Sequence, residues 1–394
     1  MKKKNHVLAH RLTGAHSSLW VSVLAILLTF VTASVLLLLM GKNPLLAFYS
    51  FLQGSGLAPK GNYGGGSGML SDFFDFLNYL SPMLLASLAF SVGFKAGLFN
   101  IGSSGQMLLS GSLATAVVGY RQNLPAAAAK PLVIVVGILA GGAMGALIGF
   151  LKYRFNIHEV VSTIMINYII SYLTGFFINN NYVDMLTRTS RVCSPASRLT
   201  WTGVQIGGVN CKVPMGFAIA ILMALFVQFI FDKTVFGFEL KAVGLNRECA
   251  RYAGMGVGRS IVASMAFSGV LAGLAGVTYY LGYSNTIIPK TLAGMGYDSI
   301  AVALLGNASP VGSIFAAIVV TIFQQGANYM SSVVGVAKEI ASLITGILLL
   351  YASCGTYMKL KAGRIVQREE DLEAVNHVTE RESSLREERE EELK

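Results

Sequence analysis

The stretch LWVSVLAILLTFVTASVLLLLM, Leu19–Met40, contains no charged residue. At a rise of 1.5 Å per residue, a helix over this stretch crosses about 30 Å of hydrocarbon. The whole chain has the same character, because 54% of its 394 residues are apolar and only 13% are charged, against about 25% in soluble domains. The sequence therefore predicts an integral membrane protein whose first span is retained, since this run is too long for a signal peptide.

Further apolar runs follow along the chain. They cover about 77–94, 104–119, 131–151, 160–178, 213–231, 261–281, 311–330 and 339–355, with a shorter run at about 299–308. Their continuous apolar character excludes a β-barrel, whose strands alternate with a period of two. We predict an all-α, polytopic membrane bundle of about 8–10 transmembrane helices, one or two of them broken or partial.

Basic residues near the first span predict its orientation. Lys2, Lys3, Lys4 and Arg11 precede it, so we expect residues 1–18 to be cytoplasmic. If the spans are counted forward from residue 19, the transmembrane region 19–355 has outside loops at 41–76 and 179–212 and an inside loop at 232–260. The net charge of +10 is explained by this topology rather than by nucleic-acid binding, because nucleic-acid motifs are absent.

Three segments outside the spans have their own character. MLSDFFDFLNYL, at 69–80, is amphipathic and is expected to lie at the membrane interface. The tail 356–394 is dense in charge and is expected to be a solvated cytoplasmic extension. Cys193 and Cys211 share the loop 179–212, where either a disulfide or two free thiols is possible.

One predicted span carries a polar stripe. Glu159, Thr163, Asn167 and Ser171 are four residues apart, so they lie on one side of a helix. Polar side chains are costly against lipid, and this side must therefore face protein or water. The two interpretations are hydrogen bonding between helices and one wall of a polar pathway, and we favour the pathway.

A second polar group interrupts two apolar runs. KAGLFNIGSSGQ, at 95–106, contains Asn100, Ser103, Ser104 and Gln106. It is either a cytoplasmic turn or a helix broken inside the membrane, whose exposed backbone groups are tolerated where they line a cavity. Asp298 precedes the short apolar run and is interpreted either as a helix cap or as a pathway residue.

Motifs of catalysis are absent: the chain has no G-x-x-x-x-G-K-[ST], no H-E-x-x-H and no G-x-S-x-G. The loop 232–260 instead contains Glu248, Ala250 and Gly254 in the pattern E-x-A-x-x-x-G. This pattern predicts a short amphipathic helix that ends at Gly254. It resembles the EAA-type coupling loop of ABC importer permeases, which docks onto a separate ATPase subunit.

Other stretches resemble the permease family that serves sugars, nucleosides and branched-chain amino acids. They are FNIGSSGQ (99–106), EVVSTIMINYI (159–169), typical of the nucleoside and simple-sugar branch, and GYDSIAVALLGNASPVGSIFAA (296–317). The resemblance covers about 80–355. Family members more often have Ala-Glu where this chain has Ser103-Ser104. Any role that the glutamate has in the family is therefore not assigned to this chain.

The resemblance implies a multi-pass subunit of an ABC importer in a bacterial plasma membrane. Its expected partners are an ABC ATPase, a second permease copy or paralogue, an extracytoplasmic binding protein and membrane lipid, with no nucleic acid. ATP and Mg would be bound by the ATPase, so this chain would bind no cofactor or metal and would not itself be an enzyme. A nucleoside is favoured as the solute, followed by a simple sugar such as ribose.

Further polar side chains of the loop are candidate contacts to that ATPase: Glu239, Lys241, Arg247 and Arg251. The alternative function is a secondary transporter powered by an ion gradient. Such proteins usually place ionisable residues at mid-membrane depth, whereas the predicted span interiors here hold almost none. A membrane enzyme is a third class, but the sequence contains no cluster of acids, nucleophiles or metal ligands.

Overall fold

The structure is a computed structural model that describes residues 17–60, 68–206, 209–337, 339–355, 357–358 and 360–367. Its elements follow the predicted runs. The helices are α2 (Ser17–Leu39), α3 (Pro44–Gly54), α4 (Met69–Lys95), α5 (Ser103–Ala114), η1 (Thr115–Gly119), α6 (Ala126–Phe155), α7 (Glu159–Asn181), η2 (Pro195–Ser197), α8 (Met215–Lys233), α9 (Val235–Leu245), α10 (Arg247–Tyr252), α11 (Val257–Thr278), η3 (Tyr279–Tyr283), α12 (Met295–Leu305), α13 (Pro310–Val334) and α14 (Glu339–Ser353). The strands are β1 (Thr200–Ile206) and β2 (Val209–Pro214).

Two compact units divide the chain. One unit consists of Met1–Val31 and Leu350–Lys394, and the other of Thr32–Leu349. In the first unit, Val21 and Ala362 are buried and form a small apolar cluster. The second unit contains the bundle and every candidate site residue predicted above.

Seven described helices are long and apolar enough to cross a membrane. They are α2, α4, α6, α7, α8, α11 with its π-helical extension η3, and α13. The runs at 104–119 and 339–355 form the shorter helices α5 and α14, and 299–308 forms α12. The polytopic helical fold is therefore confirmed, with α5 and α12 as partial helices.

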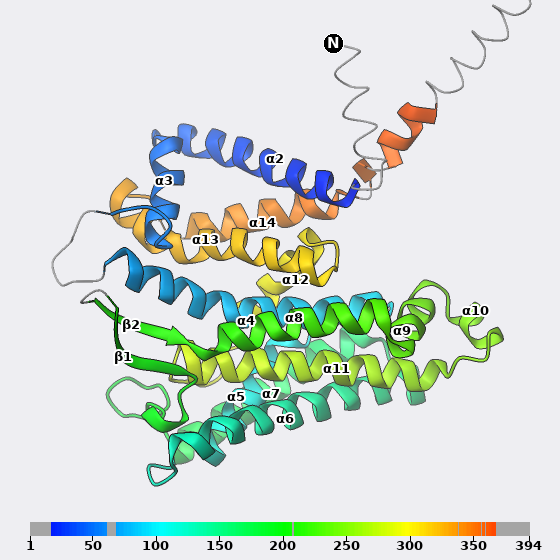
Figure 1. The fold of residues 1–394 in the computed structure, drawn as a ribbon, viewed down its shortest axis with the longest axis horizontal. Coiled ribbons are helices and arrows are strands. Elements are labelled where there is room, and N and C mark those ends of the chain that lie inside the picture. Colours follow the sequence, from blue (N-terminus) through cyan, green and yellow to red (C-terminus); the bar gives the residue numbers. More distant parts are fainter. Residues whose placement is uncertain are drawn as a thin grey trace, which may run out of the picture. The chain divides into compact units, whose positions relative to one another are not determined.

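Glycines on α6 explain its close packing against α11, which the two ribbons show along their length (Figure 1). A Cβ atom added at Gly141 would lie 2.2 Å from the carbonyl oxygen of Gly269, and one at Gly145 would lie 2.1 Å from that of Met265. No real side chain tolerates such distances, so only glycine permits this approach. The spacing of four along α6 thus forms a packing seam, as small residues do between membrane helices.

The predicted outside loops contain more structure than expected. Residues 41–76 include the helix α3, whose N-cap Asn43 accepts hydrogen bonds from the backbone N–H groups of Leu45 and Leu46. MLSDFFDFLNYL is not a separate interfacial helix, because it forms the first part of α4 without interruption. The loop 179–212 contains the antiparallel hairpin β1–β2, in which Thr200 pairs with Pro214 and Ile206 with Val209.

Some expectations lie outside the described residues. These concern the basic segment before residue 17, the tail beyond residue 367 and the glycine-rich part of the loop at 61–67.

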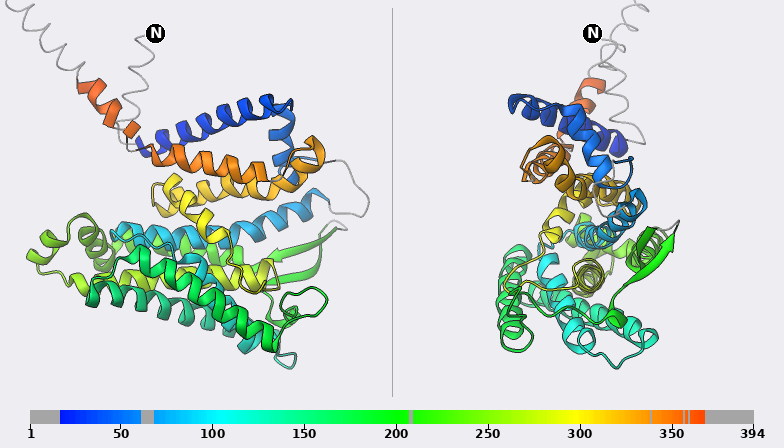
Figure 2. Two further views of the ribbon diagram at one scale, coloured as in Figure 1. Left: turned by 180° about the vertical axis from the view of Figure 1, so that it is seen from behind. Right: turned by 90° about the vertical axis from the view of Figure 1, so that its left-hand side faces the viewer.

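Within Thr32–Leu349, the long helices run side by side and their connections gather at two opposite ends (Figures 1 and 2). The β1–β2 hairpin lies at one end, here called the hairpin end. Helices α9 and α10 lie at the other, here called the α10 end. The buried core runs through α4, α5 and α11, whose side chains are largely inaccessible to solvent.

Candidate functional site

The chain turns back into the bundle after α4. Helix α4 ends at Lys95, and Gly97 adopts a left-handed conformation with φ +69°. The chain then reaches Asn100, which is fully buried and contacts Ser268, about halfway along α11. Because α5 starts only at Ser103, that helix begins inside the bundle rather than at its surface.

Asn100 satisfies the polar groups that this break exposes. Its Nδ2 donates to Ser268 Oγ at 2.8 Å and to Gln106 Oε1 at 3.2 Å, and its Oδ1 accepts from the Gly102 backbone N–H at 2.9 Å. Ser268 Oγ in turn donates to the carbonyl oxygen of Ala89 at 2.6 Å. The asparagine therefore binds the broken segment to both α4 and α11, as buried polar groups require.

Asn167 holds the same segment from the side of α7. Its Oδ1 accepts from the Gly105 N–H at 2.9 Å, and its Nδ2 donates to the Ile101 carbonyl at 3.1 Å and to Tyr297 Oη at 3.3 Å. A Cβ atom at Gly105 would lie 2.4 Å from Asn167 Oδ1. This close approach gives a physical reason for a glycine at position 105.

Two helices begin at this place and meet there. Ser104, in the first turn of α5, donates its hydroxyl to the Ala293 carbonyl at 3.0 Å, just before α12 starts at Met295. A Cβ atom at Gly296 would lie 2.3 Å from Ser104 Oγ. We call this region, formed by Asn100–Gln106, Asn167 and Ala293–Tyr297, the central junction. Helix N-termini carry partial positive charge, and such breaks are tolerated where protein or a pathway satisfies the backbone.

Three polar side chains of α5 are buried without using their full hydrogen-bonding capacity. Ser103 Oγ, Gln106 Nε2 and Ser110 Oγ have no hydrogen-bond partner in the structure. Spacings of three and seven residues place them on one side of the helix. Buried polar groups without partners are costly, so this side of α5 keeps unused hydrogen-bonding capacity inside the bundle.

The stripe on α7 faces protein, as expected. Thr163, Asn167 and Ser171 are buried, and Glu159 is mostly buried beside Lys152, whose Nζ lies 2.9 Å from Glu159 Oε2. The opposite side of α7 exposes large apolar and aromatic side chains, including Met165, Tyr168 and Tyr172. Only Asn167 of this stripe has hydrogen bonds to the central junction.

Asp298 lies in the first turn of α12, whose N-cap position is occupied by Gly294. Its Oδ2 accepts instead from Gln324 Nε2 of α13 at 3.3 Å, and the side chain is only partly buried. The interpretation as a hydrogen-bonding cap is therefore wrong. The carboxylate belongs to a separate group of polar side chains between α12 and α13.

The predicted amphipathic helix is α10. Asn246 caps it by accepting from the backbone N–H groups of Glu248 and Cys249, each at 3.0 Å. Ala250 is buried on its inner side, while Arg251 and Glu248 form an exposed ion pair at 3.3 Å. Gly254, with φ +79°, follows the helix in the left-handed conformation that glycine favours.

The α10 end contacts the turn that leads to the central junction. A Cβ atom at Gly244 would lie 2.1 Å from the Lys95 carbonyl oxygen, so α9 and this turn are in direct backbone contact. Arg247 adds a hydrogen bond from its guanidinium to the Gly97 carbonyl at 3.3 Å. Lys241 donates to the Phe231 carbonyl at 2.6 Å, which stabilises the end of α8.

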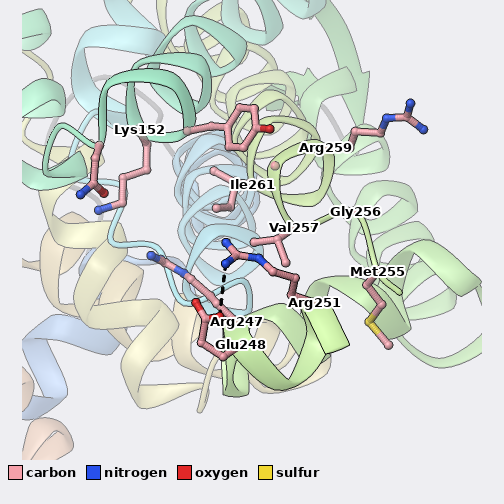
Figure 3. A pocket seen from close by; sticks show the side chains of 12 residues that line it. Lys152, Arg247, Glu248, Arg251, Met255, Gly256, Val257, Arg259 and Ile261 are labelled. Carbon is pink, nitrogen blue, oxygen red and sulfur yellow. Dashed lines mark hydrogen bonds and ion pairs between the residues drawn. The ribbon is translucent and has the colours of Figure 1, made fainter. Parts of the chain in front are cut away.

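A hollow of about 510 Å³ lies beside α10 (Figure 3). Figure 3 shows the charged side chains that line it: Lys152 from α6, Arg247, Glu248 and Arg251 from α10, and Arg259 from α11. Cations outnumber anions among these residues. The hollow therefore offers a positively charged surface around the predicted coupling helix.

Two apolar side chains at this end were not among the predicted contacts. Leu245 and Tyr252, on either side of α10, are 89% and 93% exposed. Exposed large apolar residues next to charged ones are typical of a surface that binds another protein. The pattern E-x-A-x-x-x-G did not single them out, because they occupy its unspecified or flanking positions.

Glu239, the remaining predicted contact to the ATPase, lies on α9 and is partly exposed.

At the hairpin end, Cys193 and Cys211 are both buried and free. Burial raises the pKa of the Cys193 thiol above its usual value, although Thr115 at 3.9 Å and Arg198 act in the opposite direction. Such a thiol stays protonated and has low reactivity at neutral pH. No group of His, Cys, Asp and Glu that suits a metal ion occurs in the described part of the chain.

A spanning bundle whose helices break and restart in its interior is typical of a transport permease. Residues 73–353 match the family described as branched-chain amino acid transport system / permease component, and the chain belongs to this family.

Three ABC transporter permease proteins are similar to the chain over most of its length. The chain is 33% identical over 353 residues to the guanosine ABC transporter permease protein NupP of Bacillus subtilis, covering 89% of this chain and 98% of NupP. It is 32% identical to the nucleoside ABC transporter permease protein NupB of Lactococcus lactis, covering 84% and 89%. It is 26% identical to the glucose ABC transporter permease protein TsgB13 of Haloferax volcanii, covering 71% and 75%. No solved structure matches the chain significantly.

Proposed function

We propose that this chain is the membrane subunit of an ABC importer that translocates a nucleoside or a simple sugar, with a nucleoside favoured. A separate ATPase subunit binds ATP and Mg and drives the transport cycle. A second permease copy or paralogue completes the pathway, and an extracytoplasmic binding protein delivers the solute. The subunit lies in a bacterial plasma membrane with the α10 end and the N-terminus in the cytoplasm.

One observation carries this proposal: α10 is exposed on one side and attached on the other to the turn before the central junction. Gly244 touches the Lys95 carbonyl, and Arg247 binds the Gly97 carbonyl. Movement of α10 by an attached ATPase would therefore be transmitted to Asn100 and the start of α5. Names of the relatives support the solute class, because NupP and NupB are named for guanosine and nucleosides and TsgB13 for glucose.

The pathway in this proposal passes the central junction. Ser103 and Gln106 have unused hydrogen-bonding capacity there, Ser110 has more about one turn further along α5, and Asn167 holds the broken segment in place. Uncharged amide and hydroxyl groups suit a neutral solute rich in hydroxyl groups.

Association with the ATPase tests the proposal. Tyr252→Asp replaces an exposed ring on the α10 end with a charge, which disfavours burial in an interface. We expect the variant to insert normally and to lose co-purification with the ABC ATPase of its source organism, expressed in the same cells. Leu186→Asp is the matched control, because Leu186 is 94% exposed in the loop at the hairpin end.

The control should retain the ATPase at the wild-type level. If Tyr252→Asp and Leu186→Asp retain the ATPase equally, and Gly254→Asp also leaves association and uptake unchanged, the assignment of α10 as the coupling helix is wrong.

A further inference from the structure

Helix α13 carries a polar stripe along the half nearer Val334. Thr321, Gln325, Asn328 and Ser332 fall within an arc of about 60° at 100° per residue. Asn328 and Ser332 are exposed, and the buried Thr321 hydroxyl has no hydrogen-bond partner in the structure. Polar groups inside a membrane span face water or protein rather than lipid, so this side of α13 is not a lipid surface.

Three tyrosines from α4 and η3 lie beside the stripe. The ring centroids of Tyr79 and Tyr283 are 5.1 Å apart with the planes at 81°, and those of Tyr279 and Tyr283 are 5.9 Å apart at 30°. Tyr283 Oη accepts a hydrogen bond from Gln325 Nε2 at 3.1 Å, which joins the aromatic rings to α13. The Tyr283 ring remains 36% exposed.

A carboxylate completes the group. Asp298 accepts from Gln324 Nε2 at 3.3 Å, and Gln324 directly precedes Gln325, which binds Tyr283. Gln324 is about 21 Å along α13 from Pro310 at 1.5 Å per residue, so the group lies well inside the bundle. We call Tyr79, Tyr279, Tyr283, Gln324, Gln325 and Asp298 the tyrosine–amide cluster.

The cluster lies toward the hairpin end, away from α10. The π-helix η3 contacts β1, and Thr200 Oγ1 donates to the Gly282 carbonyl at 3.4 Å. Asp298 is also on α12, one residue after Tyr297, which binds Asn167 in the central junction. The cluster therefore lies between the hairpin end and the junction, where a solute that enters from the hairpin end would arrive first.

We propose that the tyrosine–amide cluster is the site at which the permease holds the heterocyclic base of a nucleoside before the solute reaches the central junction. This inference rests on the proposed function and names the solute class and the residues that select it. The accessible Tyr283 ring stacks on the base, Gln324 and Gln325 bind polar atoms on the edge of the base, and Asp298 accepts hydrogen bonds from hydroxyl groups of the sugar.

The chemistry of the side chains favours a base over a sugar alone. Proteins that bind unpaired bases stack them on aromatic side chains and bind their edges with polar side chains. Glutamine can donate and accept at once, which matches the adjacent donors and acceptors of a base.

The test compares the uptake of tritiated guanosine and tritiated ribose in cells that lack the native gene and express the complex. Tyr283→Leu removes the ring and keeps an apolar side chain. We expect it to lower guanosine uptake at subsaturating concentration by roughly 5- to 150-fold, the range for loss of one base–aromatic stacking contact. Tyr283→Phe keeps the ring and should retain most uptake.

Two controls separate this role from a structural one. Tyr172→Leu removes a 62% exposed tyrosine on the apolar outer side of α7, away from the cluster, and should leave uptake unchanged. All variants are checked for membrane insertion and for co-purification with the ATPase and a tagged second permease. Tyr283→Leu should pass these checks while its guanosine uptake falls.

Each other result has a defined meaning. Wild-type guanosine uptake by Tyr283→Leu overturns the base-stacking site and leaves the importer function intact. If the wild type takes up ribose but not guanosine in an ATPase-dependent way, the base-stacking site is also overturned and the importer function again remains intact. Loss of the second permease from Tyr283→Leu overturns the site in favour of a subunit interface. ATPase-independent transport by the wild type instead overturns the proposed function itself.

Discussion

At the scale of single residues, Asn100 and Asn167 do most to hold the break between α4 and α5. Each binds backbone groups on one side and another helix on the other. An amide can do this because it offers an acceptor and two donors on one planar group. The two asparagines thus replace the regular backbone hydrogen bonds that the chain loses when α5 starts inside the bundle.

Replacement of Asn167 by leucine should impair transport without preventing insertion. The change leaves the Gly105 N–H and the Ile101 carbonyl without partners, which costs about 1–3 kcal/mol for each buried group. We expect uptake to fall by about tenfold and the melting temperature in detergent to decrease. Uptake normalised to the amount of protein in the membrane measures the first effect, and thermal unfolding of the purified protein in detergent measures the second.

Met165→Leu is the control for this prediction, because Met165 is 55% exposed on the other side of α7. Wild-type uptake by well-inserted Asn167→Leu would mean that the α7 stripe serves only packing.

The sequence identifies both asparagines as unusual, because each is a polar residue within or beside an apolar run. The sequence does not reveal that both asparagines bind the same broken segment. Asn167 contacts that segment through residues that lie 62 or more positions away in the chain. Asp298 shows the same limit. Its place before an apolar run indicates a cap, but its partner Gln324 belongs to the next helix.

At the scale of helices, the closest packing depends on glycine. Helix α11 uses different sides for different partners: Gly269 and Gly273 face α6, whereas Gly276 faces Met107 of α5. Backbone contact on both sides fixes the position of α11, which also supplies Ser268 to the central junction.

Gly145→Ala should destabilise the protein more than Gly142→Ala on the same helix. A Cβ atom at Gly145 would lie 2.1 Å from the Met265 carbonyl oxygen, while one at Gly142 would lie 3.0 Å from a Val270 methyl group, a side chain that can move. Overpacking typically costs about 1–3 kcal/mol, so we expect a clearly lower melting temperature for Gly145→Ala. Equal melting temperatures for the two variants would contradict the seam.

The positions of the helices follow from the sequence more closely than their partners do. Continuous apolar runs predict spans, and the glycine spacing in α6 predicts a seam. The identity of α11 as the partner, and the meeting of α5 with α12, depend on contacts between distant segments. Helix α3 lies in the segment 41–76 that the span count predicts as an outside loop, and its 11 residues are too few to indicate a span.

At the scale of the whole molecule, the two ends of the bundle have different chemistry. The α10 end exposes charged and apolar groups around one short capped helix, and it touches the turn before the central junction. Between that junction and the hairpin end lies the tyrosine–amide cluster. A force applied at α10 and a solute that arrives from the hairpin end would therefore meet at Asn100–Gln106.

Transport in proteoliposomes tests this central claim most directly. The permease, its second permease, the ATPase and the binding protein are reconstituted together, and uptake of tritiated guanosine is measured with ATP and Mg on the ATPase side. We predict accumulation that requires ATP and disappears when the ATPase is omitted. Accumulation by this chain alone, driven by a proton or sodium gradient, would contradict the account.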